Sequence, residues 1–175
     1  SGEAVREETR LSNAGFTLIE LILVLILVGI LSLYALPRFF NKDTFDTRAF
    51  GDKARATVRY AQKVAIAQNR PVFVDFSSGR IALCFDAACN TFVNSPSVKQ
   101  ANASCANSTT WMCEALPANV VIAPANQRFF FNALGRPFNI GNAEPVSTFA
   151  LLTITLTGGS LNSTITIEPE TGYVH

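Results

Sequence analysis

An apolar stretch near the amino terminus constrains this chain more than any other feature. The stretch covers residues 16–36, and Glu20 is its only charged residue. A helix of that length rises about 30 Å, which equals the hydrocarbon thickness of a bilayer. Apolar side chains would occupy every face of this helix, so it has no polar stripe with which to lie on a membrane surface. The stretch therefore predicts a membrane-spanning helix.

Glu20 needs an explanation inside that helix. A carboxylate in hydrocarbon costs about 3 kcal/mol on insertion scales, and such residues are normally paired or functional. No Lys or Arg lies between Leu11 and Leu36, so a cationic partner must come from elsewhere. Cleavage after Gly15 would give Phe16 a free amine that could serve. The alternative is a secretory signal or a plain single-pass anchor. A secretory signal has a shorter apolar core, and its cleavage site follows that core. A plain anchor has no use for a buried charge.

A short motif opens the apolar stretch and a proline follows it, in the order Gly15-Phe16-Thr17-Leu18-Ile19-Glu20 and then Pro37. These residues resemble the class III signal of type IV pilins and pseudopilins. The resemblance implies that a prepilin peptidase cuts after Gly15 and methylates the new amine of Phe16. It also implies that Glu20 neutralises the Phe16 amine of a neighbouring subunit during filament assembly.

The same resemblance implies a location and a set of partners. Residues 1–15 would be a cytoplasmic leader, and residues 16–37 a transmembrane and assembly helix in the bacterial inner membrane. The implied partners are other pilin subunits in a helical filament, the prepilin peptidase, an inner-membrane assembly platform and membrane lipid. From the membrane the subunit would pass into a pilus or a periplasmic pseudopilus. The leader departs from the family at Ala14, where a basic residue is usual, and its nearest positive charge is Arg10.

After Pro37 the pattern becomes amphipathic. Apolar residues recur at steps of three and four, which is the spacing of one helix face: Phe50, Ala54, Val58, Ala61 and Ala65. Residues 38–70 are therefore predicted to form a second helical half, joined to the first by a bend at Pro37, because proline removes one backbone hydrogen bond. This half carries eight basic residues against three acidic ones.

Residues 71–175 read as a β-rich periplasmic or extracellular domain. Short apolar or alternating runs predict strands at residues 72–76, 81–85, 119–123, 128–132, 149–157 and 163–168. Gly158 and Gly159 mark a turn between the last two. Residues 94–118, rich in Ser, Asn, Thr and Ala, are expected to form a long loop. A helix followed by strands predicts an α+β fold, with the long helix packed on an antiparallel sheet.

Four cysteines lie downstream of the predicted anchor, where an oxidising compartment would preserve disulfides: Cys84, Cys89, Cys105 and Cys113. Three pairings are possible. We favour Cys84 with Cys89 and Cys105 with Cys113, because each pair closes a short local loop. A zinc site is the alternative, but it normally uses cysteine pairs two to four residues apart, so no metal is expected.

The chain lacks the usual parts of a catalytic site. His175 is its only histidine and is expected at a frayed end. No glycine-rich phosphate loop and no identifying carboxylate pair occur, so we predict a protein that is not an enzyme and uses no cofactor. From Pro71 onward acidic residues outnumber basic ones by six to four, and no nucleic-acid partner is expected.

Three further segments are similar to the H-type pseudopilins and their minor-pilin relatives, including those of mannose-sensitive haemagglutinin pili: residues 54–71, 131–137 and 165–172. This similarity implies a structural, minor pilin subunit assembled into a type IV pilus through its amino-terminal helix. Two alternatives stay open. One is a pseudopilin of a type II secretion system, and the other is a tip adhesin whose loop at residues 94–118 captures a ligand.

Overall fold

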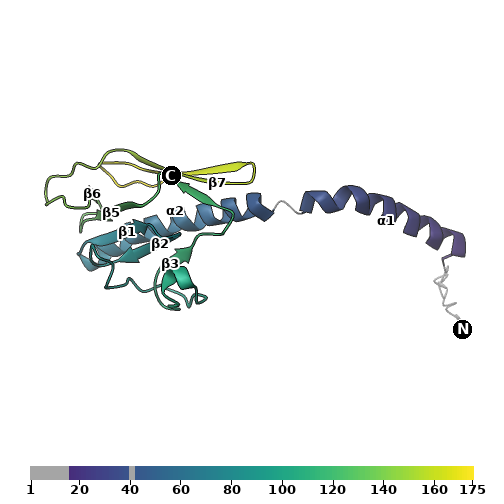
Figure 1. Ribbon diagram of the computed structural model, residues 1–175, viewed down its shortest axis with the longest axis horizontal. Helices are drawn as coiled ribbons and strands as arrows, with labels where there is room; N and C mark the ends of the chain where they lie inside the picture. Colours follow the sequence, from purple (N-terminus) through teal and green to yellow (C-terminus); the bar gives the residue numbers. More distant parts are fainter. Residues whose placement is uncertain (1–15, 40–41) are drawn as a thin grey trace, which may run out of the picture. The chain divides into compact units, whose positions relative to one another are not determined.

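The computed structural model describes residues 16–39 and 42–175. The chain divides into two compact units, of which the first ends at Phe40 and the second begins at Asn41. The first unit contains the helix α1 (Leu18–Phe39). The second contains the helix α2 (Lys42–Gln68), the eight strands of the described chain and one short 3₁₀ helix (Figure 1). An α+β fold is therefore confirmed for the described chain.

Helix α1 begins with a side-chain cap. The backbone N–H of Glu20 donates to Oγ1 of Thr17 at 3.3 Å, and the N–H of Leu21 donates to the carbonyl of Thr17 at 3.2 Å. The hydroxyl of Thr17 thus satisfies the N–H of Glu20, one of the donors that every helix leaves free in its first turn, while its carbonyl accepts the first ordinary helix bond. The helix continues through Pro37 to Phe39. The bend predicted at Pro37 stays a prediction, since residues 40 and 41 lie outside the described chain.

Across the part of the chain that the structure describes, no helix combines the length and the apolar character that a membrane crossing requires.

Helix α2 has the predicted amphipathic character, within narrower bounds than residues 38–70. All five residues of the predicted apolar stripe are buried, from Phe50 to Ala65. The residue after the helix, Asn69, has a φ of 49° in the left-handed region, and the N–H of Arg70 bonds back to the carbonyl of Ala65 at 3.2 Å. A left-handed residue followed closely by Pro71 is a common way to stop a helix.

The strands form two antiparallel sheets, whereas the sequence predicted one. A five-stranded sheet has the order β3-β2-β1-β5-β6, and a three-stranded sheet has the order β4-β7-β8. The first contains β1 (Val72–Phe76), β2 (Arg80–Cys84), β3 (Cys113–Ala115), β5 (Gln127–Phe131) and β6 (Pro137–Asn139). The second contains β4 (Val121–Ala123), β7 (Leu152–Gly158) and β8 (Leu161–Ile167).

Six of these strands lie where the sequence predicted them, and two do not. Strand β3 lies inside the segment that was expected to be a loop, and it has only three residues at an edge of the sheet. Strand β6 begins at Pro137 and was not predicted. Proline is tolerated at the first position of an edge strand, because its missing N–H then costs no ladder bond.

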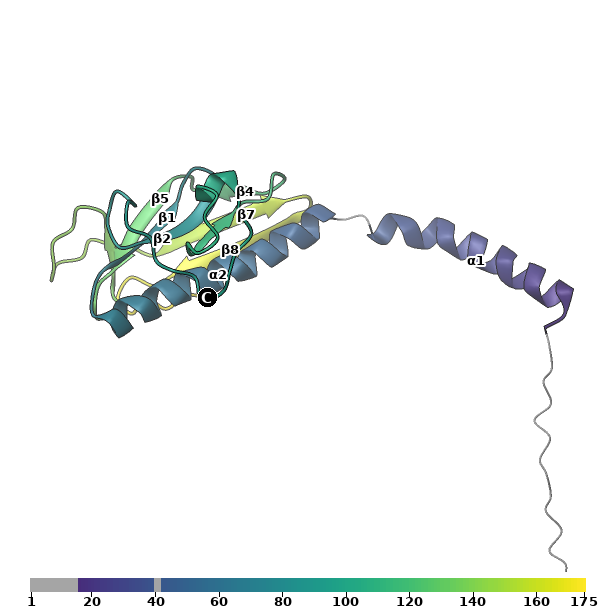
Figure 2. The ribbon, with the colours of Figure 1, turned by 90° about the horizontal axis from the view of Figure 1, so that it is seen from below.

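Both sheets share one core with α2. Figure 2 shows α2 running along them with β8 beside it, and its buried stripe packs on β8, β7 and β1. Close packing occurs where glycines allow it, because a Cβ on Gly51 or Gly158 would collide with Ser163 or Thr47. The interior is rich in aromatic rings, such as Phe129, which meets Phe131 and Phe149 at centroid distances of 5.5 and 5.3 Å.

Hydrogen bonds hold the carboxyl-terminal segment in place, so the prediction of a frayed end at His175 is wrong. His175 and Thr166 exchange two backbone hydrogen bonds of 2.8 and 3.0 Å. The guanidinium of Arg59 on α2 donates twice to the carbonyl of Val174, at 3.0 and 2.8 Å. The sequence could not indicate this anchoring, because both partners lie away from the terminus along the chain.

Candidate assembly site

Helix α1 exposes apolar side chains all round. Every side chain from Phe16 to Ser32 is exposed, and the large apolar ones range from 43% at Ile22 to 81% at Phe16. Isolated apolar side chains are ordinary on protein surfaces, but a continuous apolar surface of this extent marks a site of interaction. Within the described residues of the first unit, no second helix or strand is available to cover it.

The predicted pairing residues lie at the start of this surface. Phe16 precedes the helix, and Glu20 lies in its first turn. Among the ion pairs of the described side chains, none involves Glu20. A cationic partner from another molecule would therefore meet no competitor among these residues. Gly15, the predicted cleavage residue, lies outside the described chain.

Thr17 and Glu20 have the spacing of a helix cap, which the sequence reasoning missed. The spacing Thr17-x-x-Glu20 is that of a capping box, and its threonine half is formed. A carboxylate in the first turn also interacts favourably with the positive end of the helix dipole. The pattern of a threonine followed three residues later by a glutamate could have revealed this role.

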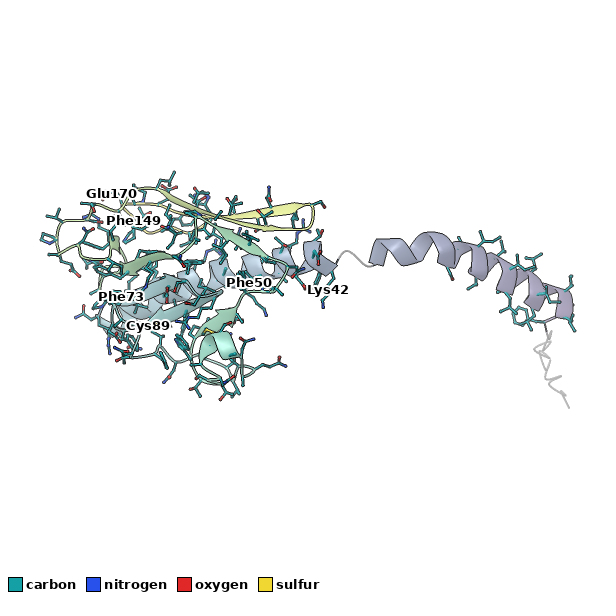
Figure 3. All side chains as sticks on the ribbon, viewed as in Figure 1. Lys42, Phe50, Phe73, Cys89, Phe149 and Glu170 are labelled. Atoms are coloured by element: carbon teal, nitrogen blue, oxygen red, sulfur yellow. A yellow bond between two sulfur atoms is a disulfide. The ribbon has the colours of Figure 1, made fainter. Side chains whose placement is uncertain are left out.

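The four cysteines form the pairs that the sequence favoured. Cys84 is bonded to Cys89 and Cys105 to Cys113, with Cα–Cα distances of 5.1 and 5.8 Å. No group of three or more potential metal ligands occurs among the described residues. Both disulfides lie on one region of the five-stranded sheet, and Figure 3 shows Cys89 beside Phe73 there.

The segment at residues 94–118 contains short pieces of regular structure. Its two arms are joined by backbone hydrogen bonds, from Ser95 to Thr110 at 2.7 Å and from Lys99 to Thr109 at 2.8 Å. A one-turn 3₁₀ helix, η1 (Ala103–Cys105), caps the far end. The predicted loop holds for most of the segment, but β3 and these backbone bonds were not predicted, because they pair residues whose Ser- and Asn-rich sequence has no strand pattern.

A cavity of about 360 Å³ opens between this segment and α2. It is bordered by Lys53 on α2, by residues 98–102 and by the β3 strand. Lys99 and Glu114 form an ion pair in its wall, with side chains that are 22% and 16% exposed. These two charges satisfy each other, so Lys53 supplies the remaining charge among the residues that border the cavity.

Asp86 lies inside the loop that Cys84 and Cys89 close. This carboxylate accepts hydrogen bonds from the backbone N–H groups of Asn90, at 3.0 Å, and Thr91, at 2.5 Å. These bonds, that of Asn90 foremost, hold the pKa of Asp86 below its ordinary value of 3.8. Because folding lowers the pKa of Asp86, its ionised carboxylate stabilises the folded loop at pH values above the ordinary pKa. This stabilisation is lost as the pH falls through the lowered pKa.

We therefore expect the Asn90 and Thr91 amide resonances to move together when the pH is lowered below about 3.8. The measurement is a two-dimensional NMR titration of the full chain in detergent. Asp86→Asn should show the acid-like positions already at neutral pH. Amide positions in wild type that stay constant down to the acid limit would contradict the assignment.

Two sequence comparisons with known proteins bear on this site. A family model described as the prokaryotic N-terminal methylation motif matches residues 10–36. The chain is 40% identical over 58 residues to the type IV narrow pilus major component PilA5 of Thermus thermophilus. That alignment covers 33% of this chain and 50% of the relative, so the chain spans half the length of the curated relative that it matches.

Among solved structures, the chain is similar to the type IV minor pilin FimU of Pseudomonas aeruginosa PAO1. The crystal structure in space group P21 has a TM-score of 0.47 at 13% identity, and covers 73% of this chain and 85% of FimU. The structure in space group P65 has a TM-score of 0.46 at 12% identity, and covers 73% of this chain and 90% of that one.

Proposed function

We propose that this chain, a type IV pilin-like protein, is a structural subunit that enters a type IV pilus through α1. The observation that carries the proposal is the methylation motif over residues 10–36, which coincides with a helix exposing apolar side chains on every face. A helix of this kind needs lipid or other helices around it. A structural role also agrees with a relative that is itself a pilus component.

Before assembly, the apolar stretch at residues 16–36 would rest in the inner membrane. Arg38 and Lys42 follow this stretch in the sequence, where they could meet lipid headgroups. A prepilin peptidase would remove the leader after Gly15 and methylate Phe16, and an assembly platform would pass the subunit to the filament. In the filament, neighbouring α1 helices would replace lipid as the apolar surroundings.

Glu20 would set the axial register of each subunit. It is the only charge in residues 16–36, so a neighbour's Phe16 amine has one position at which it is compensated. An ion pair in apolar surroundings is strong, and removing one partner leaves a buried charge that costs about 3–5 kcal/mol. Any other register would therefore be penalised by two uncompensated charges.

A pilus is proposed in preference to a secretion pseudopilus because the curated relative is a component of a narrow pilus. The two differ in a simple phenotype. Deletion of the gene should remove or shorten surface filaments and leave the secretion of exoproteins intact. Blocked exoprotein release with normal filaments would point to the type II secretion alternative.

Processing of the leader is the first test of the proposal. Intact mass of the protein extracted from membranes of its native host should correspond to a start at Phe16 with one added methyl group. Gly15→Leu should retain the leader, because the peptidase would lose its glycine. Ala14→Lys, which restores the basic residue usual in the family, should be processed at least as fast as wild type. A wild-type chain with an intact leader, or one cut elsewhere, would overturn the proposal.

A further inference from the structure

Asp75 is a buried carboxylate in the middle of the five-stranded sheet. It lies on β1, the central strand, opposite Ala82 on β2 and Arg128 on β5, and it is 3% exposed. Its neighbours on the same face include Phe73 and the disulfide-bonded cysteines, so it points away from α2. Nothing in the assembly role of α1 uses this residue. Burying a carboxylate is costly unless charged partners compensate it.

Two arginines provide that compensation. Nη2 of Arg80 lies 3.5 Å from Oδ2 of Asp75, and Nε of Arg128 lies 3.3 Å from Oδ1. The arginines come from the strands on either side of β1, one from β2 and the other from β5. A single carboxylate thus orients two guanidinium groups.

Each guanidinium reaches a different disulfide-bonded segment. Nη1 of Arg80 donates to the carbonyl of Ser104 at 2.8 Å, directly before Cys105. Nη2 of Arg128 donates to the carbonyl of Ala87 at 2.5 Å, inside the loop that Cys84 and Cys89 close. The planar guanidinium suits this task, because its donors point in fixed directions and bridge two acceptors.

We infer that Asp75 orients both Arg80 and Arg128, and that it thereby fixes both disulfide-bonded segments to the face of the sheet that points away from α2. We call residues 85–112 the disulfide platform. While Asp75 contacts both arginines, the two halves of this platform are held to the same strand, β1. When Asp75 is removed, each guanidinium loses the partner that orients it, and both halves come loose together.

Other contacts also hold the platform, and they define the rival account. The indole of Trp111 donates to the carbonyl of Leu83 at 2.8 Å, and the rings of Phe92 and Trp111 stack at 4.1 Å. With the backbone bond between Met112 and Val93, these contacts could hold the platform without Asp75. In that case the contacts of Arg80 and Arg128 would contribute little to holding the platform.

The test measures how fast a soluble thiol reductant reduces each disulfide in the full chain in detergent. Freed thiols are trapped by alkylation and assigned by peptide mass spectrometry. Asp75→Asn should accelerate the reduction of both disulfides by at least about tenfold, because it removes the buried negative charge that holds both guanidinium groups in place. Asp52→Asn is the control: it removes an exposed partner of Arg55, 3.0 Å away on α2, and should leave both rates unchanged.

The arginine variants separate the contribution of Arg80 from that of Arg128. Arg80→Met should accelerate chiefly the reduction of Cys105–Cys113, and Arg128→Met chiefly that of Cys84–Cys89. Methionine keeps the apolar stem and removes the guanidinium. These two variants carry the test even if Asp75→Asn does not fold. The inference would be overturned if Asp75→Asn leaves either rate unchanged, or if each arginine variant accelerates both reductions equally.

Discussion

Replacing Glu20 by valine should leave the protein in the membrane but reduce its incorporation into filaments at least about a hundredfold. Valine removes the only charge of residues 16–36, so insertion into lipid becomes easier. In the filament, the neighbour's Phe16 amine would lose its partner, and an uncompensated buried charge costs about 3–5 kcal/mol. The measurement is the ratio of this chain in sheared filaments to that in membranes, by quantitative immunoblotting.

Two control variants separate the possible roles of Glu20. Leu21→Val changes a neighbouring apolar residue and should assemble normally. Glu20→Gln keeps a side chain that can complete the capping box with Thr17, yet it cannot neutralise an amine. We expect Glu20→Gln to fail almost as completely as Glu20→Val. Normal assembly of Glu20→Gln would assign Glu20 to helix capping, and normal assembly of Glu20→Val would remove the pairing account altogether.

Replacing Gly172 by alanine should lower the free energy of unfolding of the second unit by about 2–4 kcal/mol. Gly172 has a φ of 65°, which costs any other residue energy, and it packs tightly. A Cβ there would lie 2.5 Å from the carbonyl oxygen of Gly135 and 2.7 Å from Nε2 of Gln62. That amide already bonds the carbonyls of Gly135 and Thr171, at 2.9 and 2.8 Å, so it has little freedom to move.

Gly79 is the matched control for Gly172. Its φ is 67°, but a Cβ at this position would meet nothing within 4 Å. Gly79→Ala should therefore lower the free energy of unfolding only by the cost of the left-handed backbone conformation, about 1–2 kcal/mol. The comparison uses denaturant unfolding followed by the fluorescence of Trp111, the only tryptophan of the chain. Equal losses in the two variants would show that the close packing of Gly172 contributes nothing.

Local sequence pattern was sufficient for the helices and for most strands. The stripe from Phe50 to Ala65 predicted the buried face of α2, and the run at residues 72–76 has the bounds of β1. Strand β2 was predicted one residue late, at residues 81–85. In the structure Arg80 pairs with Ala115 on β3, a partner that the local pattern does not reveal.

Features that depend on distant residues could not be predicted. The division into two sheets is decided by which strands pair, and three-residue strands such as β3 and β6 carry no recognisable alternation. The role of Asp75 was hidden for the same reason: its two arginines are adjacent only once β1, β2 and β5 are aligned. The sequence around Asp75 reads simply as a strand.

The candidate assembly site shows the opposite case. Its chemistry could be proposed from residues 15–20 alone, because a motif at fixed spacing and one charge in an apolar run need no fold to be recognised. The structure adds that Thr17 caps α1 and that the large apolar side chains from Phe16 to Leu31 are exposed. The proposed pairing would join two subunits, so the partner of Glu20 would lie in another copy.

Electron cryo-microscopy of filaments purified from the native host tests the central claim most directly. The account predicts this chain within the filament, beginning at a methylated Phe16, with α1 among other helices in the core. It further predicts the Glu20 carboxylate within about 4 Å of a neighbour's Phe16 amine, the limit for an ion pair. A filament that contains this chain with Glu20 turned away from every neighbouring amine, or filaments that lack it, would contradict the account.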